Sequence, residues 1–286
     1  MNFWDKLMNI DRRIIFLFVV VAVTLPLFLN ISQKTTISYE VQRGFDEMAR
    51  LQAGARVLIP CDYDPPSAPE LQPMTIAAIR FCLDHDLKII IMGLWPQGPQ
   101  QANAALASVL GETPGETTTW KGKTLVYGTD WVNLGYQAGY ELLIQRMGSS
   151  IPAAFPRDFR GTPIAELPLM QGVQNFNNID FAINVTAGYP GVVEWVQFGV
   201  DRFRLKLLCG TTAVQAPLVY PYFESGQLRG ILGGLKGASE FEELVGVPGK
   251  ATKFMLSQSL AHIIVILFII VGNAAYFVGG RRKKTS

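Results

Sequence analysis

Two uncharged apolar segments near the ends of this 286-residue chain constrain its fold more than any other feature. The first, Ile14–Leu29, follows two arginines and contains one proline, Pro26. The second, Leu260–Val278, is followed by two glycines and the basic sequence RRKK. A helix that crosses a bilayer needs roughly 20 apolar residues. We therefore expect transmembrane helices at residues 14–31 and 259–279, with the rest of the chain between them.

The flanks of these segments predict how the chain is oriented. A cleaved signal peptide is the alternative for the first segment, but residues 30–34 (NISQK) lack the small-residue site at which signal peptides are cut. Lysines and arginines concentrate on the cytoplasmic side of membrane helices. Basic residues lie outside both segments, so we expect residues 1–13 and 280–286 in the cytoplasm. Residues 32–258 then lie outside the cytoplasm, in a two-pass protein of the cell membrane.

The composition excludes several classes of protein. Charged residues make up 17% of the chain, against about 25% in an ordinary soluble domain. The 25 Lys and Arg nearly balance the 23 Asp and Glu, so no basic surface for nucleic acid is indicated. Three cysteines are too few for a disulfide scaffold, and two histidines are too few for a histidine-rich metal site. We expect no metal and no cofactor.

The central segment alternates short apolar runs with helix-like stretches, which is typical of α/β proteins. The expected strands are residues 56–60, 88–92, 124–127, 180–185 and 204–209. The expected helices are residues 38–51, 74–83, 100–110, 135–147 and 191–200. Residues 149–179 contain four prolines and break this rhythm, and residues 227–245 begin as a glycine-rich stretch. We predict an α/β fold with an open, mostly parallel, doubly wound (Rossmann-like) sheet between the two transmembrane helices. A half domain like those of periplasmic binding proteins is the alternative.

A parallel sheet of this kind binds ligands beyond the carboxyl ends of its strands. The residues that follow the expected strands are therefore candidates for a ligand site, although polar residues after strands are common in ordinary turns. Those that we select are Asp62, Asp64, Trp95, Thr129, Asp130, Tyr189, Cys209 and Thr211. The glycine-rich stretches match no nucleotide-binding motif.

Catalysis has weaker support in the sequence. Cys61, Asp62 and Asp130 are the candidate catalytic residues, but a cysteine nucleophile needs a base, usually histidine. His85 follows a helix and should lie at the opposite edge of the sheet from Cys61. The carboxylates of Asp62, Asp64 and Glu70 have the spacing D-x-D-x5-E, which lacks the glycine of an EF-hand loop. Cys61 and Cys209 either pair as a disulfide or remain buried thiols.

The second transmembrane segment carries a polar residue at depth. Asn273 lies beside Gly272, and small residues allow close helix packing. Asn273 is expected to bond either the chain's own first helix or another membrane helix. The expected partners are the lipid bilayer and either a second copy of the chain or another membrane protein, with no nucleic acid.

Three functions remain as hypotheses. The preferred one is a membrane-anchored, non-enzymatic α/β protein that assembles with itself or a membrane partner, or presents a binding domain outside the cytoplasm. The second is an extracytoplasmic hydrolase that uses the aspartates and cysteine at the strand ends. The third is a receptor or sensor for a small ligand.

Overall fold

The computed structural model describes residues 11–29, 36–111 and 116–283. The chain divides into two compact units, one made of residues 1–34 with 252–286 and the other of residues 35–251. Parts of three predicted segments lie outside the described residues. They are residues 1–10 of the N-terminal segment, residues 30 and 31 of the first span, and residues 284–286 of the basic tail.

The larger unit is built on a sheet of six parallel strands in the order β5-β2-β1-β6-β7-β8. The strands are β1 (Arg56–Asp62), β2 (Lys88–Gly93), β5 (Trp131–Tyr136), β6 (Phe181–Thr186), β7 (Leu207–Thr211) and β8 (Leu228–Gly233). Counted along the chain, the order is 3-2-1-4-5-6, which is that of doubly wound dinucleotide-binding folds. The predicted Rossmann-like α/β fold is confirmed.

The central strand β1 shows why the sheet is covered on both faces. Successive side chains of a strand point to opposite faces. Val57 and Ile59 belong to one hydrophobic core, while Leu58, between them, belongs to the other. A strand buried on both faces reads as a continuous apolar run, which explains why residues 57–59 and 89–92 were recognisable from sequence.

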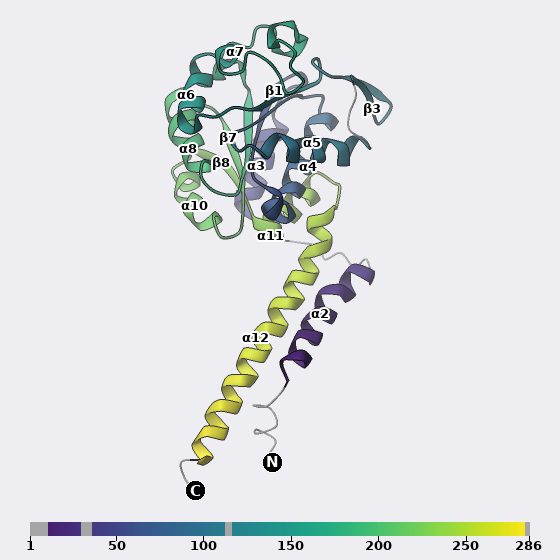
Figure 1. Ribbon diagram of the computed structural model, residues 1–286, viewed down its shortest axis with the longest axis vertical. Helices are drawn as coiled ribbons and strands as arrows, with labels where there is room; N and C mark the ends of the chain where they lie inside the picture. The colour runs from purple at the N-terminus through teal and green to yellow at the C-terminus, as the bar shows by residue number, and fades with distance from the viewer. Residues whose placement is uncertain (1–10, 30–35, 112–115, 284–286) are drawn as a thin grey trace. The chain divides into compact units, whose positions relative to one another are not determined.

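Helices pack on both faces of the sheet (Figure 1). One face carries α3 (Tyr39–Ala49), α4 (Ala68–Asp84), α5 (Gly98–Leu110) and α11 (Gly234–Leu244). The other carries α6 (Tyr140–Ser149), α7 (Ile151–Ala154), α8 (Val192–Trp195) and α10 (Ala216–Glu224). Helix α8 continues as the π-helix η5 (Val196–Val200) and as α9 (Asp201–Phe203). Parallel strands need crossover connections, and here the helices of those connections cover both faces.

The third expected strand, residues 124–127, is not in the sheet. It forms β4 (Lys123–Val126), which pairs with β3 (Thr117–Trp120) as an antiparallel hairpin. The third strand of the sheet is β5, in a segment where we expected a helix to begin at Gly135. Asn133 and Gly135 interrupt the apolar pattern of this edge strand, and the side chain of Asn133 accepts the N–H of Gly135 at 2.9 Å.

Two further segments differ from expectation. The glycine-rich stretch from residue 227 contains the sixth strand, β8, because Gly230 lets α3 approach closely at Gly44. The proline-rich segment 149–179 contributes buried apolar side chains to the core. It contains α7 and the 3-10 turns η2 (Ile164–Glu166), η3 (Pro168–Met170) and η4 (Phe176–Asn178).

The smaller unit contains two helices, α2 (Arg12–Leu29) and α12 (Lys250–Lys283). The rings of Phe18 and Phe268 meet edge to face with centroids 6.1 Å apart. Among the described residues, one helical segment, Lys250–Phe277, is long and apolar enough to cross a membrane. The pair of flanking spans that we predicted is therefore not found. Helix α2 is described over 18 residues, of which the first two are arginines, so its apolar part is shorter than the roughly 20 residues of a full span.

Candidate functional site

Asp62 ends β1 at the point where the strand order reverses, between β1 and β6. Its carboxylate is fully buried. Oδ1 accepts the backbone N–H of Leu94 at 2.6 Å, and Oδ2 accepts from Asn184 Nδ2 at 2.8 Å and from Trp195 Nε1 at 3.0 Å. The side chain thus joins the end of β1 to the end of β2, to β6 and to α8.

Burial raises the pKa of Asp62 to about 7. The three donors favour the ionised form and lower this pKa, whereas the nearby carboxylate of Glu194 raises it. Because the side chain is closed to solvent, we interpret Asp62 as a residue that holds the strand ends together. Its geometry does not support contact with a ligand or a substrate.

Cys61 and Cys209 are buried free thiols. Burial raises both pKa values well above the usual range, so neither sulfur is an activated nucleophile. Strand β6 lies between their strands, and the two side chains belong to cores on opposite faces of the sheet. A disulfide between them is therefore excluded.

A pocket of about 240 Å³ opens beyond the carboxyl ends of β6 and β7. We call it the edge pocket. Its lining residues come from the ends of both strands and from the first turns of the helices that follow them. They are Thr186, Gly188, Tyr189, Val192, Val193, Glu194, Thr211, Gln215, Leu218 and Val219.

Thr211 is the most informative residue of the edge pocket. It is only 1% exposed, and its hydroxyl has no hydrogen-bond partner among the described residues. A buried hydroxyl without a partner is unfavourable by about 1–3 kcal/mol. A ligand or an ordered water in the pocket would complete the hydrogen bond.

Among the described residues, Glu194 is the only charged one that lines the edge pocket. It lies in the first turn of α8, where its Oε2 accepts the N–H of Gly191 at 2.7 Å. The side chain is half-buried. Tyr189 forms part of the rim, 65% exposed, and its hydroxyl donates to Glu141 Oε2 at 3.4 Å.

The structure brings only part of the predicted ligand set to the edge pocket. Tyr189 and Thr211 line it. Trp95 supports the rim from outside, because its Nε1 donates to the carbonyl of Pro190 at 2.9 Å. Asp64 instead begins the 3-10 helix η1 (Pro65–Ser67), where its side chain accepts the Ser67 hydroxyl at 2.9 Å.

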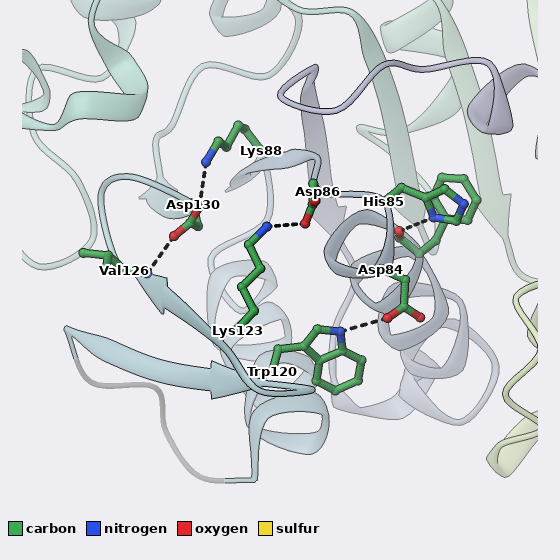
Figure 2. Close-up of polar contacts among 9 residues, drawn as sticks. Asp84, His85, Asp86, Lys88, Trp120, Lys123, Val126 and Asp130 are labelled. Atoms are coloured by element: carbon green, nitrogen blue, oxygen red, sulfur yellow. Dashed lines mark hydrogen bonds and ion pairs between the residues drawn. The ribbon is translucent and has the colours of Figure 1, made fainter.

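Thr129 and Asp130 come directly before β5, so they lie at the opposite, amino edge of the sheet. Figure 2 shows Asp130 beside Lys88 at this edge. Asp130 pairs with Lys88 at the start of β2 over 2.6 Å and accepts the Val126 N–H at 2.8 Å. Burial raises the pKa of Asp130, but these two contacts outweigh it and leave the pKa below its usual value. The expectation that Thr129 and Asp130 face the same edge as Asp62 is wrong, because the strand here begins at Trp131.

The same amino edge holds His85, as predicted from its place after a helix. Its Nδ1 lies 2.9 Å from the carbonyl oxygen of Phe81, and its ring stacks on that phenyl ring. The β3–β4 hairpin contacts the end of α4 here, where Trp120 donates to Asp84 at 2.9 Å (Figure 2). His85 therefore lies at the opposite edge of the sheet from Cys61 and cannot act as its base.

The described residues contain no group of three or more His, Cys, Asp and Glu side chains that could hold a metal ion. Asp62 is buried, Asp64 starts a 3-10 turn, and Glu70 accepts the N–H of Ala213 at 2.8 Å. A dinucleotide in this fold would place its pyrophosphate at the turn after β1. The carboxylates of Asp62 and Asp64 occupy that turn, so its charge opposes an anionic cofactor.

Sequence reasoning missed Glu194, Gln215 and the apolar lining residues. They lie on helices or, for Gln215, at the cap just before α10, rather than directly after strands, and the strand-end rule does not select them. A weak signal was present, because Glu194 follows Gly191 at the spacing of a helix-capping residue. A scan of family models, a search of curated proteins and a search of solved structures each find no match to this chain.

Proposed function

We propose that this chain is a membrane-anchored α/β protein whose domain binds a small molecule in the edge pocket. The observation that carries the proposal is the Thr211 hydroxyl, buried in the pocket wall without a hydrogen-bond partner among the described residues. The pocket also lies at the strand edge where sheets of this order bind ligands. Its mixed polar and apolar lining is typical of small-molecule sites.

Native mass spectrometry of the full chain, extracted gently from its own membrane, tests this proposal. We expect a small molecule to accompany the wild-type chain. Leu218→Trp adds bulk to a lining residue and should abolish its retention. Val214→Trp is the matched control, because Val214 is exposed and does not line the pocket. A wild-type chain without any bound molecule, or equal retention by Leu218→Trp, contradicts the proposal.

The same proposal includes a two-pass topology with the α/β domain outside the cytoplasm. The segment Lys250–Phe277 supports one span. The second span and the orientation rest on the sequence alone, on the uncharged run Ile14–Leu29 and on the basic residues at 12–13 and 281–284. The three native cysteines are buried, which permits labelling of introduced ones. A membrane-impermeant maleimide should label Val214→Cys in intact cells and should label Ser286→Cys only after lysis. The reverse pattern would show the opposite orientation.

Assembly through α12 is a second candidate, favoured by one specific observation. Gly272 and Asn273 are both exposed, and a Cβ added at Gly272 would meet no atom within 4 Å. The exposed side chain of Asn273 is accessible to a partner helix. A polar amide in a membrane helix favours a partner helix. Because a carboxamide both donates and accepts, a second copy of the chain can pair with it reciprocally.

The mass of the full chain in mild detergent tests the assembly. Asn273→Leu should shift a dimer toward monomer, because the interhelical amide pair is lost. Ile269→Leu, also on an exposed part of α12, should leave the dimer unchanged. A wild-type chain that is monomeric at all concentrations, or a dimer that Asn273→Leu leaves intact, would exclude this interface.

A further inference from the structure

The charges around the edge pocket are of one sign. In the part of the chain that the structure describes, Glu194 is the only charged lining residue, and no lysine or arginine lines the pocket. Behind the pocket wall lies the buried carboxyl group of Asp62, whose pKa is raised chiefly by burial, with a smaller contribution from Glu194. A ligand with a carboxylate or phosphate would therefore meet repulsion from fixed negative charge.

Helix N-termini at this edge do not reverse that balance. Each carries about half a positive charge and would ordinarily favour an anion. At the start of α8, Glu194 already accepts the Gly191 N–H at 2.7 Å. Just before α10, Glu70 already accepts the Ala213 N–H at 2.8 Å. Each N-terminus thus has its own carboxylate, whose full charge exceeds the partial charge of the helix.

The polar atoms of the edge pocket that lack hydrogen-bond partners suit a ligand that ends in a hydrogen-bond donor. Glu194 Oε1 accepts no hydrogen bond from the described residues, and the Thr211 hydroxyl is without a partner there. Thr186 Oγ1 also lines the pocket, but it already lies within hydrogen-bond distance of the carbonyl oxygens of Asp62 and Gly188, at 3.2 and 3.3 Å. A primary ammonium group has three N–H donors, which such oxygens can accept. The remaining wall is aliphatic, with side chains Val192, Val193, Leu218 and Val219.

We infer that the edge pocket takes a ligand with a protonated amine at one end and an apolar body at the other. This inference rests on the proposed ligand-binding function and names the chemical class of the ligand. The ammonium group contacts Glu194 and Thr211, and the apolar body packs on the valine and leucine side chains. The carboxylate of Glu194, half-buried and without a cationic partner among the described residues, gains its counter-charge from the ligand.

Three probes with one carbon skeleton test the inference: 2-phenylethylamine, 2-phenylethanol and phenylacetate. Each is titrated calorimetrically into the full chain in detergent. We expect the amine to bind about tenfold tighter than the alcohol, because it adds a charge-assisted hydrogen bond, and phenylacetate to bind weakest. In Glu194→Gln the amine and alcohol should bind alike. Glutamine keeps an oxygen for the Gly191 N–H, so the start of α8 is preserved.

Glu70→Gln is the matched control, because Glu70 starts the other helix and does not line the pocket. It should keep the preference for the amine. Equal binding of amine and alcohol by the wild type, or tightest binding of phenylacetate, overturns the amine inference but leaves a ligand-binding pocket. Absence of binding by all three probes, together with a wild-type chain that carries no small molecule, contradicts the proposed function itself.

Discussion

The indole Nε1 of Trp195 donates a hydrogen bond to Oδ2 of Asp62 over 3.0 Å, although the two residues are 133 positions apart in the chain. Both side chains are fully buried. The bond ties α8, which carries Glu194, to the end of β1. The position of the charged wall of the edge pocket therefore depends on a carboxylate that does not itself line the pocket.

The raised pKa of Asp62 predicts that the free energy of unfolding falls as the pH rises. Burial raises this pKa to about 7 in the folded chain, from 3.8. The folded state therefore holds the proton more tightly, and the stability that Asp62 contributes is complete below about pH 4 and lost as pH rises through 7. Relative to Asp62→Asn, the wild type should lose roughly 4 kcal/mol of unfolding free energy between pH 4 and pH 8.

Urea unfolding of the full chain in detergent, followed by tryptophan fluorescence across this pH range, measures that difference. Asp130→Asn is the control with the opposite sign. The pKa of Asp130 is lowered, so its contribution is present above the unfolded-state pKa and is lost as pH falls. If the unfolding free energies of Asp62→Asn and the wild type change with pH by the same amount, a raised pKa at Asp62 is excluded.

Thr211→Val should make the ligand-free chain more stable and its binding weaker. Valine has the shape of threonine, and it removes a buried hydroxyl without a partner among the described residues, so we expect a gain of about 1 kcal/mol. Thr75→Val is the matched control. Its hydroxyl lies 2.9 Å from that of Tyr63, so its loss should destabilise the chain. Thermal unfolding with and without ligand measures both effects, and a destabilised Thr211→Val would count against a site there.

Gly98→Ala should disrupt the start of α5. A Cβ at this position would lie 1.7 Å from the carbonyl oxygen of Cys61, which is backbone and cannot move aside cheaply. We expect a loss of at least about 1–3 kcal/mol, as for other overpacked sites. Gly188→Ala is the control, because its nearest neighbour, on Trp95, would be 3.9 Å away. Urea unfolding midpoints compare the two, and equal midpoints would contradict the predicted steric conflict.

The three cysteines should resist alkylation in the folded chain. All are buried, and burial raises the pKa of each thiol, so little thiolate is present at pH 8. Iodoacetamide followed by intact-mass measurement should find no added group under native conditions and three after urea unfolding. Modification of Cys61 in the native chain would show that the end of β1 is open to solvent.

Several features of the site were visible in the sequence. The apolar run of β1 stops at Asp62, and those of β6 and β7 stop near Tyr189 and Thr211. A polar residue directly after a buried strand marks the carboxyl edge, so a local pattern was enough to select them. The same rule does not select Glu194, which lies on α8, or Gln215, which caps α10.

Other features required the tertiary structure. Asn133 and Gly135 interrupt the apolar pattern of β5, so the sequence does not identify this edge strand and predicts the wrong edge for Asp130. The pairing of β5 with β2 identifies the strand. The sequence does not decide whether Cys61 and Cys209 form a disulfide. The structure excludes it, because β6 lies between their strands. Strand order depends on which long-range contacts bury the most apolar surface, and no local pattern records it.

The sequence by itself therefore determined the alternation of strands and helices, the apolar C-terminal helix and the residues that end the buried strands. These follow from local periodicity and burial, which neighbouring residues encode. Only the tertiary structure decided that Trp195 reaches Asp62 and that Glu194 and Thr211 share one pocket. Those relationships join distant segments, because the packing of both faces of the sheet, rather than any short stretch, sets which strand ends meet.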